Sequence, residues 1–248
     1  MIEVRQLKKS FGSQLILDGV DLKIESGESA AIIGRSGGGK SVLLKHLIGL
    51  LQPDSGEVLV DGENITRMNE RQLLRVRAKF GMVFQGAALF DSMTVAENVA
   101  FPLVRQKKHT AAEIEKRVAA ALEVVDLAGT QKKKPAELSG GMRKRAGLAR
   151  AIVYEPQILL YDEPTTGLDP IVSDSIDHLI MHVRDHLNVT SIVVTHDMRT
   201  ARRVGNQVFL LHEKRIYAGG PPEEFFASPD PVVRQFVDGV ADAKETIF

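Results

Sequence analysis

A glycine-rich octapeptide between an apolar run and a helical pattern carries the first residues with clear chemistry, Gly34-Arg35-Ser36-Gly37-Gly38-Gly39-Lys40-Ser41. It satisfies G-x-x-x-x-G-K-[ST], a pattern whose glycines let backbone N–H groups surround phosphate oxygens at the start of a helix. We expect Lys40 to reach the outer phosphates and Ser41 to ligate Mg²⁺. A merely flexible turn is the alternative, but a strand before the loop and a helix after it are the context that the pattern requires. The residues expected to bind the phosphates are Gly34, Ser36, Gly37, Gly38, Gly39, Lys40 and Ser41.

Two adjacent acidic residues follow an apolar run, Ile158 to Tyr161, in the last third of the chain. A buried parallel strand would deliver both acids to the carboxyl edge of a sheet, where ligands bind in α/β proteins. Asp162 is then placed to hold Mg²⁺, and Glu163 to orient and polarise an attacking water. Two acids after a strand are, taken alone, more often a loop start or a helix cap, so this prediction depends on the phosphate loop.

A second anion-binding pattern, Ser139-Gly140-Gly141, stands before an amphipathic run that is rich in Arg and Lys. Ser139 fits an ordinary helix N-cap, while its hydroxyl, the bare backbone N–H groups and the positive end of the helix dipole also suit a phosphate. One ATP cannot use both this site and the phosphate loop within one compact chain. The two patterns therefore favour an arrangement in which two chains share each nucleotide.

Short apolar runs alternate with longer amphipathic ones, and this alternation predicts an α/β fold. We expect a helix from Ser41 to Leu51, a helix from a capping box at Thr110 to a stop at Gly129, and a helix capped by Asp169. A helical insertion near residues 86–155 interrupts a strand-rich core. The expected strands are Ile2–Val4, Leu15–Leu17, Val20–Ile24, Ser29–Ile33, Val58–Val60, Ile158–Tyr161, Ser191–Thr195 and Gln207–Leu211.

Composition excludes several classes of protein. The 248 residues are 44% hydrophobic and 26% charged, which is ordinary for a globular domain and argues against overall disorder. Lys plus Arg and Asp plus Glu both total 32, so no global positive charge is available to hold nucleic acid or an anionic membrane. The absence of cysteine excludes a disulfide scaffold and a thiolate zinc site. No run approaches the roughly 20 apolar residues that cross a bilayer, so we expect a cytosolic protein.

With these motifs in this order, the sequence resembles the ATP-binding subunit of ATP-binding cassette (ABC) transporters over nearly its whole length. The resemblance implies that Phe11 stacks on adenine and that Gln85, after an apolar tripeptide, senses the γ-phosphate and Mg²⁺. His196 matches the switch histidine that contacts the γ-phosphate, and Gly167-Leu168-Asp169 matches the D-loop. The catalytic residues that the family implies are Glu163, His196 and Gln85, and the implied Mg²⁺ ligands are Ser41, Gln85 and Asp162.

The same resemblance implies the fold and the working assembly. The fold is a P-loop NTPase of ABC type, an α/β protein with a RecA-like parallel-sheet core, an antiparallel β subdomain and an inserted α-helical subdomain. In the homodimer, the Ser139-Gly140-Gly141 loop of one chain closes over the ATP held by Lys40 and Ser41 of the other. Met142 stands where glutamine is commonest in the family, and it cannot make the hydrogen bonds of a glutamine.

Three segments resemble more narrowly the ATPases of Mla and Mce-type lipid transporters: residues 81–95, the basic Arg143-Lys144-Arg145 behind the signature loop, and residues 228–239. In that group the ATPase drives a transmembrane permease coupled to an MCE-domain lipid-binding protein, which moves phospholipid across the envelope of Gram-negative bacteria. The resemblance implies a peripheral protein at the cytoplasmic face of the inner membrane, with no nucleic-acid partner. It also implies an ATP-binding domain over residues 1–240 and a C-terminal tail over residues 241–248.

Two apolar segments are expected at interfaces. Residues 85–102 hold more apolar groups than a short connection needs, and we expect them to dock the permease rather than to pack within the helical insertion. The tail from Pro229 to Val240 places apolar residues at helical spacing, and we expect that stripe to grip a partner, with burial on the chain's own core as the alternative. The apolar residues concerned are Leu89, Phe90, Met93, Val95 and Phe101 in the first segment and Val232, Val233, Phe236 and Val237 in the second.

Other functions compete with a lipid-transport ATPase. The chain could serve another ABC importer or exporter, or be a soluble ABC ATPase of the DNA-repair or translation type. The soluble type normally has two cassettes, long coiled-coil arms or a basic surface, none of which the sequence displays. A small-molecule or nucleoside kinase would use the same phosphate loop but would need an acceptor-binding lid and would have no use for Ser139-Gly140-Gly141.

Overall fold

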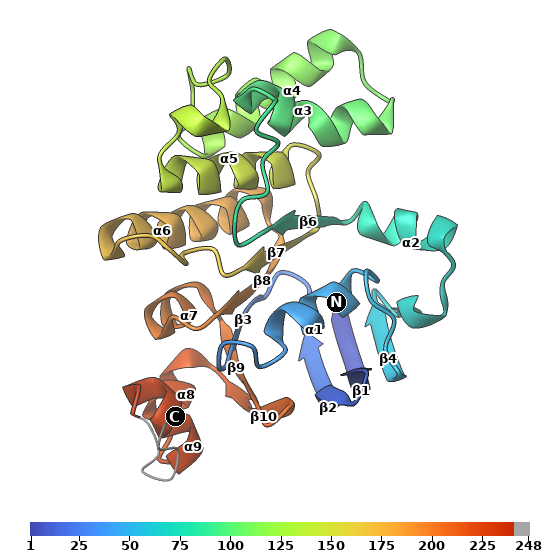
Figure 1. The fold of residues 1–248 in the computed structure, drawn as a ribbon, viewed down its shortest axis with the longest axis vertical. Coiled ribbons are helices and arrows are strands. Elements are labelled where there is room, and N and C mark those ends of the chain that lie inside the picture. The colour runs from blue at the N-terminus through green and yellow to red at the C-terminus, as the bar shows by residue number, and fades with distance from the viewer. Residues whose placement is uncertain (241–248) are drawn as a thin grey trace. The chain divides into compact units, whose positions relative to one another are not determined.

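The computed structural model describes residues 1–240 (Figure 1). The chain divides into two compact units, which we name by their motifs: the phosphate-loop unit, residues 1–73 with the chain from residue 193 onward, and the signature unit, residues 74–192. Helix α2 (Glu70–Arg77) and strand β8 (Thr190–Thr195) contain the two points of division. The predicted limits of the ATP-binding domain and of the helical insertion stay predictions, and the predicted tail over 241–248 lies outside the described residues.

An antiparallel sheet opens the phosphate-loop unit. Its four strands follow the order β2-β1-β4-β5, formed by Gln14–Ile24, Ile2–Phe11, Ser55–Val60 and Glu63–Asn64. The two short strands expected over residues 15–24 are one strand, because Gly19 forms a bulge between the pairs Leu7↔Val20 and Lys8↔Asp18. With φ of +72° Gly19 adopts a backbone conformation that glycine reaches without steric cost, so the strand continues through it. A short 3₁₀ helix, Ile65–Arg67, follows the sheet.

A second group of strands in the same unit supports the phosphate loop. Strand β3 (Ser29–Ile33), which is buried along its whole length, pairs in parallel with β9 (Gln207–His212). Strand β10 (Arg215–Gly220) returns antiparallel to β9 through a two-residue turn at Glu213 and Lys214, whose φ values are +45° and +69°. Both turn residues lie in the left-handed region, as a tight hairpin of matching twist requires. Helix α1 (Lys40–Leu47) follows β3 and ends four residues before the predicted Leu51.

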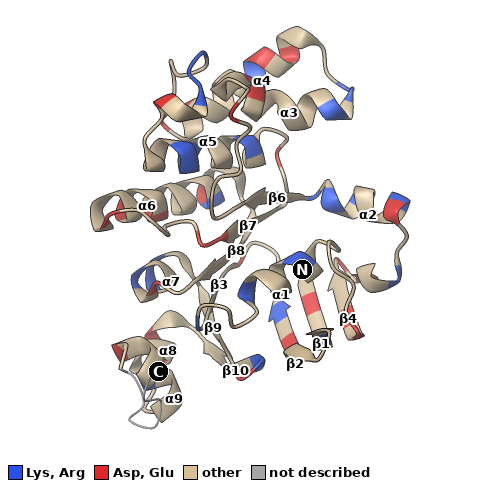
Figure 2. Ribbon diagram, in the orientation of Figure 1, with Lys and Arg blue, Asp and Glu red and all other residues tan. Residues whose placement is uncertain are grey.

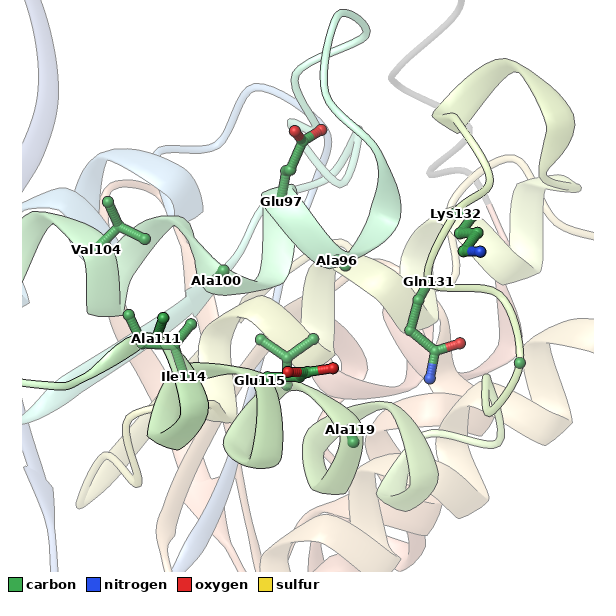
Figure 3. A pocket seen from close by; sticks show the side chains of 12 residues that line it. Ala96, Glu97, Ala100, Val104, Ala111, Ile114, Glu115, Ala119, Gln131 and Lys132 are labelled. Carbon is green, nitrogen blue, oxygen red and sulfur yellow. The ribbon is translucent and has the colours of Figure 1, made fainter.

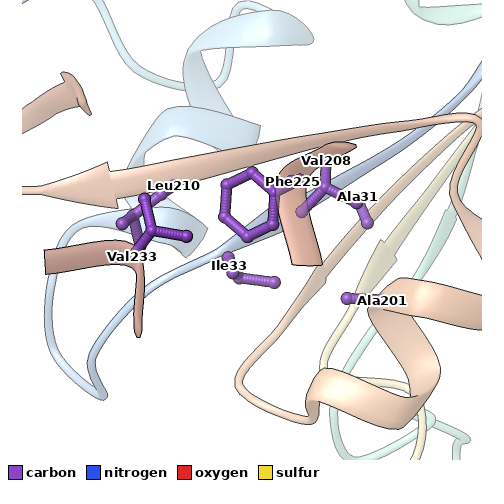
Figure 4. Packing of buried hydrophobic residues seen from close by; sticks show 7 residues of the cluster. All are labelled: Ala31, Ile33, Ala201, Val208, Leu210, Phe225 and Val233. Atoms are coloured by element: carbon purple, nitrogen blue, oxygen red, sulfur yellow. The ribbon is translucent and has the colours of Figure 1, made fainter. Parts of the chain in front are cut away.

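The C-terminal helices close this unit on its own core, which contradicts the expectation that the tail stripe is kept for a partner. Val233 of α9 (Pro231–Asp238) is 1% exposed and Phe225 of α8 (Pro222–Ala227) is 5% exposed. Figure 4 shows them in one cluster with residues of β3, β9 and α7 (Met198–Val204). The flanking tail residues Val232, Phe236 and Val237 are partly buried against the same cluster. The stripe therefore finds its apolar partner within the chain. The cluster comprises Ala31, Ile33, Ala201, Val208, Leu210, Phe225 and Val233.

The signature unit combines two parallel strands with four long helices. Strands β6 (Phe80–Val83) and β7 (Ile158–Asp162) pair in parallel, and every residue of β7 except Asp162 is buried. Helices α3 (Val95–Gln106) and α4 (Ala111–Val124) both begin with a capping box, at Thr94 and Thr110. Helix α4 ends at Val124, so Gly129 is not its stop as predicted but lies in the following turn, with φ of +82°. Helix α5 (Gly140–Ile152) packs against α3, α4 and α6 (Pro170–Leu187).

The segment between β6 and α3 is less exposed than predicted. Val95 is fully buried and Phe101 is half-buried, whereas Phe90 is 43% exposed and its ring lies 4.9 Å from that of Phe101. The buried Asn98 of α3 organises this segment: its Nδ2 donates to the carbonyls of residues 90, 93 and 94, and its Oδ1 accepts from the Phe90 N–H. Of the five apolar residues expected at an interface, Val95 belongs to the core. No helix within residues 1–240 is long and apolar enough to cross a membrane.

Candidate functional site

The phosphate loop follows β3 directly and ends in α1, as the sequence predicts. Gly39 caps α1 in a left-handed conformation with φ of +98°, and a Cβ there would lie 3.1–3.2 Å from atoms of Ile16 and Leu17. Any other residue would therefore need both a strained backbone and more space. The Lys40 ammonium group lies inside the curl of the loop, where it donates to the carbonyls of Gly34 and Arg35 at 2.8 and 3.1 Å. The loop thus presents a buried cation at a helix N-terminus, which is the chemistry that a polyphosphate needs.

Two further predicted residues belong to the phosphate-loop unit. His196 is exposed directly after β8, and the next residue, Asp197, caps α7 by accepting from the backbone N–H groups of Arg199 and Thr200. The histidine is therefore held between a buried strand and a helix start. Phe11, at the end of β1, is 47% exposed, and the Lys9 ammonium group lies 5.5 Å from its ring centroid. An exposed ring suits stacking on a base, and this role of Phe11 stays a prediction.

The acid pair ends β7 in the signature unit. Asp162 is the last residue of the strand, and Glu163 follows it, 8% exposed and with a left-handed φ of +51°. The Glu163 carboxylate accepts from the Thr166 hydroxyl at 3.1 Å. A nearly buried carboxylate held by a neighbouring hydroxyl group has the fixed orientation that a water-polarising residue needs. Its strained backbone is of the kind that persists at functional sites.

The signature loop is built by packing as well as by anion chemistry. Ser139 is exposed and caps α5, where its hydroxyl accepts from the Met142 N–H at 3.3 Å. A Cβ on Gly140 would lie 3.2 Å from Leu168, and one on Gly141 would lie 2.7 Å from Val172. Close packing against the start of α6 therefore accounts for Gly141, which is buried, whereas Ser139 remains open to a ligand.

Basic residues behind the signature loop make contacts that the sequence analysis missed. The nearly buried Lys144 ammonium group donates to the carbonyl of Gln85, and at 3.3 Å to that of Glu163. Burial lowers the pKa of Lys144, and the negative charges of Glu163 and Asp162 oppose that change. The structure thus brings together Gln85, Glu163 and the signature helix through one side chain. Figure 2 shows the basic residues along α5. Their only signal in the sequence was a run of charge, for which a solvated helix face is the default expectation.

Oxygen ligands of the kind that Mg²⁺ prefers are present among the predicted residues: the Ser41 hydroxyl, the Gln85 side-chain amide and the Asp162 carboxylate. Within residues 1–240 no cluster of three or more His, Asp or Glu side chains could hold a metal ion by protein groups alone. Each is a donor type that Mg²⁺ takes together with substrate phosphates, and they are divided between the units, with Ser41 in the phosphate-loop unit and Gln85 and Asp162 in the signature unit.

A separate apolar cavity of about 650 Å³ lies between α3, α4 and the turn at residues 129–132 (Figure 3). Its walls include the small side chains of Ala96, Ala100 and Ala119, with Ile114 and Val104 beside them. None of its lining residues belongs to a predicted nucleotide-binding motif, so the cavity is not the candidate site.

Comparison with known proteins places the chain in a family. The family model described as ABC transporter matches residues 17–166, more than half of the chain. A protein named probable ribonucleotide transport ATP-binding protein mkl, from Mycobacterium leprae, is 47% identical over 238 residues, which are 96% of this chain and 69% of that protein. Its namesakes from Mycobacterium tuberculosis are covered to 66%, so the chain spans about two thirds of the length of these relatives.

Two other relatives match along most of their own length. The intermembrane phospholipid transport system ATP-binding protein MlaF of Escherichia coli K12 is 41% identical over 242 residues, which are 98% of this chain and 90% of that protein. The dimeric ATP-binding cassette MJ0796, solved in a post-hydrolysis state with ADP and Pi, matches with a TM-score of 0.81 and 32% identity, over 90% of this chain and 99% of that one. Since the family model covers more than half of the chain and these relatives cover nearly all of it, the chain belongs to the ABC transporter family and is one of its ATP-hydrolysing cassettes.

Proposed function

We propose that this chain is the ATP-hydrolysing subunit of a phospholipid transporter and drives a separate transmembrane permease. The observation that carries the proposal is the match to MlaF, which extends over 98% of this chain and 90% of that protein. The mycobacterial mkl proteins are more similar in sequence and are named for ribonucleotide transport, which makes ribonucleotides the second candidate cargo. We favour phospholipid because the chain covers only about two thirds of the mkl proteins.

The proposed roles of the residues follow from their chemistry. Lys40 and the backbone N–H groups of its loop bind the β- and γ-phosphates of ATP, and the ring of Phe11 stacks on the adenine. Glu163 orients the attacking water and accepts its proton, while His196 contacts the γ-phosphate. Ser41, Gln85 and Asp162 hold Mg²⁺, which supplies charge neutralisation at the phosphates when it is bound.

The proposed working form is a homodimer. In it, the exposed Ser139 hydroxyl of one chain donates to the nucleotide held by the phosphate loop of the other, together with the N–H groups that follow at the start of α5. The dimeric state of MJ0796 with ADP and Pi supports this arrangement by analogy. Two chains would close over ATP and separate after hydrolysis. This cycle of association and separation would drive the conformational changes of the permease.

The proposed surroundings are those of an envelope transporter. The chain would bind permease subunits at the cytoplasmic face of the inner membrane, as a peripheral protein, with an MCE-domain lipid-binding protein on the far side of the permease. The exposed Phe90 and the neighbouring half-buried Leu89 and Met93 offer an apolar surface for the permease.

A transport assay tests the proposal. The complex would be purified from membranes through a tag on this chain and reconstituted into liposomes, with Glu163→Gln as the inactive control. ATP-dependent transfer of a fluorescent glycerophospholipid between liposomes and the complex is expected from the wild type and not from the control. ATP-dependent movement of a radiolabelled ribonucleotide, without lipid transfer, would replace phospholipid by the second cargo. A complex that moves neither, although its ATPase is active, would refute both cargo assignments.

A further inference from the structure

Several residues of the signature unit adopt left-handed backbone conformations without being glycine, and three of them lie at or beside predicted site residues: Ala87, Ala88 and Glu163, with φ of +60°, +48° and +51°. Ala87 and Ala88 follow the predicted sensor Gln85, and Glu163 is the predicted water-polarising residue. Such conformations cost about 1 kcal/mol or more each for residues with a Cβ, and they persist only where surrounding contacts impose them. Side chains of one helix contact the carbonyl oxygens of all three.

One face of the signature helix α5 holds all three strained residues by their carbonyl oxygens. The Lys144 ammonium group donates to Gln85 O and Glu163 O, and the Arg150 guanidinium group donates to Ala87 O and Ala88 O at 2.7 and 2.6 Å. Between these two side chains, a Cβ on Gly147 would lie 3.2 Å from the Ala87 Cβ, so the missing side chain lets the loop lie against the helix. Residues 144, 147 and 150 are spaced three apart and therefore share one face of α5.

The hydrogen bonds of this face are of the strong kind. Both donors are charged, Lys144 is nearly buried and Arg150 is half-buried, and each bridges two carbonyls, so each can be satisfied only if both acceptors stay in place. Burial lowers the pKa of Arg150 as well as that of Lys144, which is the mark of cations held in a site with little solvent. At its other end the same loop is held by Asn98. Residues 85–94 are thus fixed to α5 on one side and to α3 on the other.

We propose that Lys144 is a positioning residue whose hydrogen bonds fix the backbones of Gln85 and Glu163 to the signature helix. Arg150 fixes the backbones of Ala87 and Ala88 to the same helix in the same way. The inference rests on the proposed roles of Gln85 and Glu163. Because one ammonium group bridges both, a displacement of α5 moves the water-polarising carboxylate and the γ-phosphate sensor together. When Ser139 at the start of α5 meets a nucleotide, Lys144 sets the backbone that presents Glu163.

The test compares three variants of the full-length chain. Lys144→Met keeps the length of the side chain and removes the charge, Lys144→Arg keeps donors, and Lys116→Met changes an exposed lysine of α4 as a matched control. ATP hydrolysis is measured as kcat and KM, binding by titration with a fluorescent ATP analogue, and backbone protection by hydrogen–deuterium exchange of peptides. We expect kcat to fall about tenfold in Lys144→Met, since two carbonyls lose a charged donor. Affinity for the analogue should stay within about twofold, because the phosphate-binding residues are untouched.

Hydrogen–deuterium exchange separates positioning from general destabilisation. Peptides covering residues 84–90 and 162–166 should exchange faster in Lys144→Met, whereas peptides of α1 and α4 should not change. Lys144→Arg should recover kcat to within about threefold of the wild type, and Lys116→Met should match the wild type throughout. An unchanged kcat in Lys144→Met overturns the proposal. Faster exchange across the whole unit in Lys144→Met, together with loss of analogue binding, also overturns it. A kcat in Lys144→Arg as low as in Lys144→Met overturns it as well. Failure of the proposed function is recognised separately, because the reconstituted complex would then transfer no phospholipid, whereas kcat and the exchange of residues 84–90 would still report the effect of Lys144.

Discussion

Truncation of Val233 to alanine should destabilise the isolated chain, because its side chain packs in the core of the phosphate-loop unit. Val233 is 1% exposed and lies with Phe225, Val208 and Leu210 in one buried cluster. Removal of two methyl groups at about 0.8 kcal/mol each, with a residual cavity, costs about 2 kcal/mol. Alanine regains about 0.5 kcal/mol as the better helix former, which leaves a net loss of about 1.5 kcal/mol. For a chain of this length that corresponds to a fall of roughly 3 °C in the melting temperature.

Thermal unfolding followed by circular dichroism, without nucleotide, measures this loss. The matched control is Val240→Ala, since Val240 is 62% exposed and its truncation should leave the melting temperature within about 1 °C of the wild type. A chain that ends after Ala227 should melt lower still, because it loses the whole of α9. Equal melting temperatures for Val233→Ala and Val240→Ala would refute the packing of the tail on its own core and would restore the partner-binding interpretation.

Two further predictions concern the interfaces of the chain. If Ser139 acts on the nucleotide of the partner chain, a mixture of Lys40→Ala and Ser139→Arg chains should regain ATP-dependent association, because their heterodimer holds one intact site. Analytical ultracentrifugation of the mixture, and of each folded variant alone, measures this association. No association in the mixture would favour a site within one chain. Phe90→Asp should reduce recovery of the permease from membranes at least fivefold. Its melting temperature should fall by only about 2 °C, because the ring is 43% exposed and loses mainly its contact with Phe101. Full recovery of the permease in this variant would exclude Phe90 from the docking surface.

The sequence predicts the strands and helices that flank the site residues more accurately than it predicts the C-terminal strand β10. The apolar run before the phosphate loop, the acid pair after Ile158–Tyr161 and the Asp169 cap are local signals, and each element forms where its signal lies. Strand β10 was not predicted because Arg215–Gly220 offers only a short apolar run, Ile216 to Ala218, and ends in two glycines; it forms by pairing with β9. Its stability comes from a long-range partner, which residue pattern does not contain.

The apolar stripe of the tail shows that helical spacing predicts burial but not the surface against which a helix packs. Helical spacing of Val232, Val233, Phe236 and Val237 predicts burial correctly, but the identity of the surface that covers them depends on where β3 and β9 lie. Lys144 and Arg150 were missed for the opposite reason. Charged side chains on a helix are usually solvated, and the carbonyls that hold these two, at residues 85, 87, 88 and 163, come from segments remote from them in the sequence.

Substitution of the carboxylate that is proposed to polarise the attacking water tests the central claim most directly. Glu163→Gln keeps the shape of the side chain and its acceptor for the Thr166 hydroxyl, but removes the base. Steady-state hydrolysis and size-exclusion chromatography with ATP would be measured side by side for this variant and the wild type. We expect ATP affinity within about twofold of the wild type, a kcat at least 100-fold lower, and accumulation of an ATP-bound dimer. An unchanged kcat, or loss of turnover without a stable ATP-bound dimer, would contradict the claim.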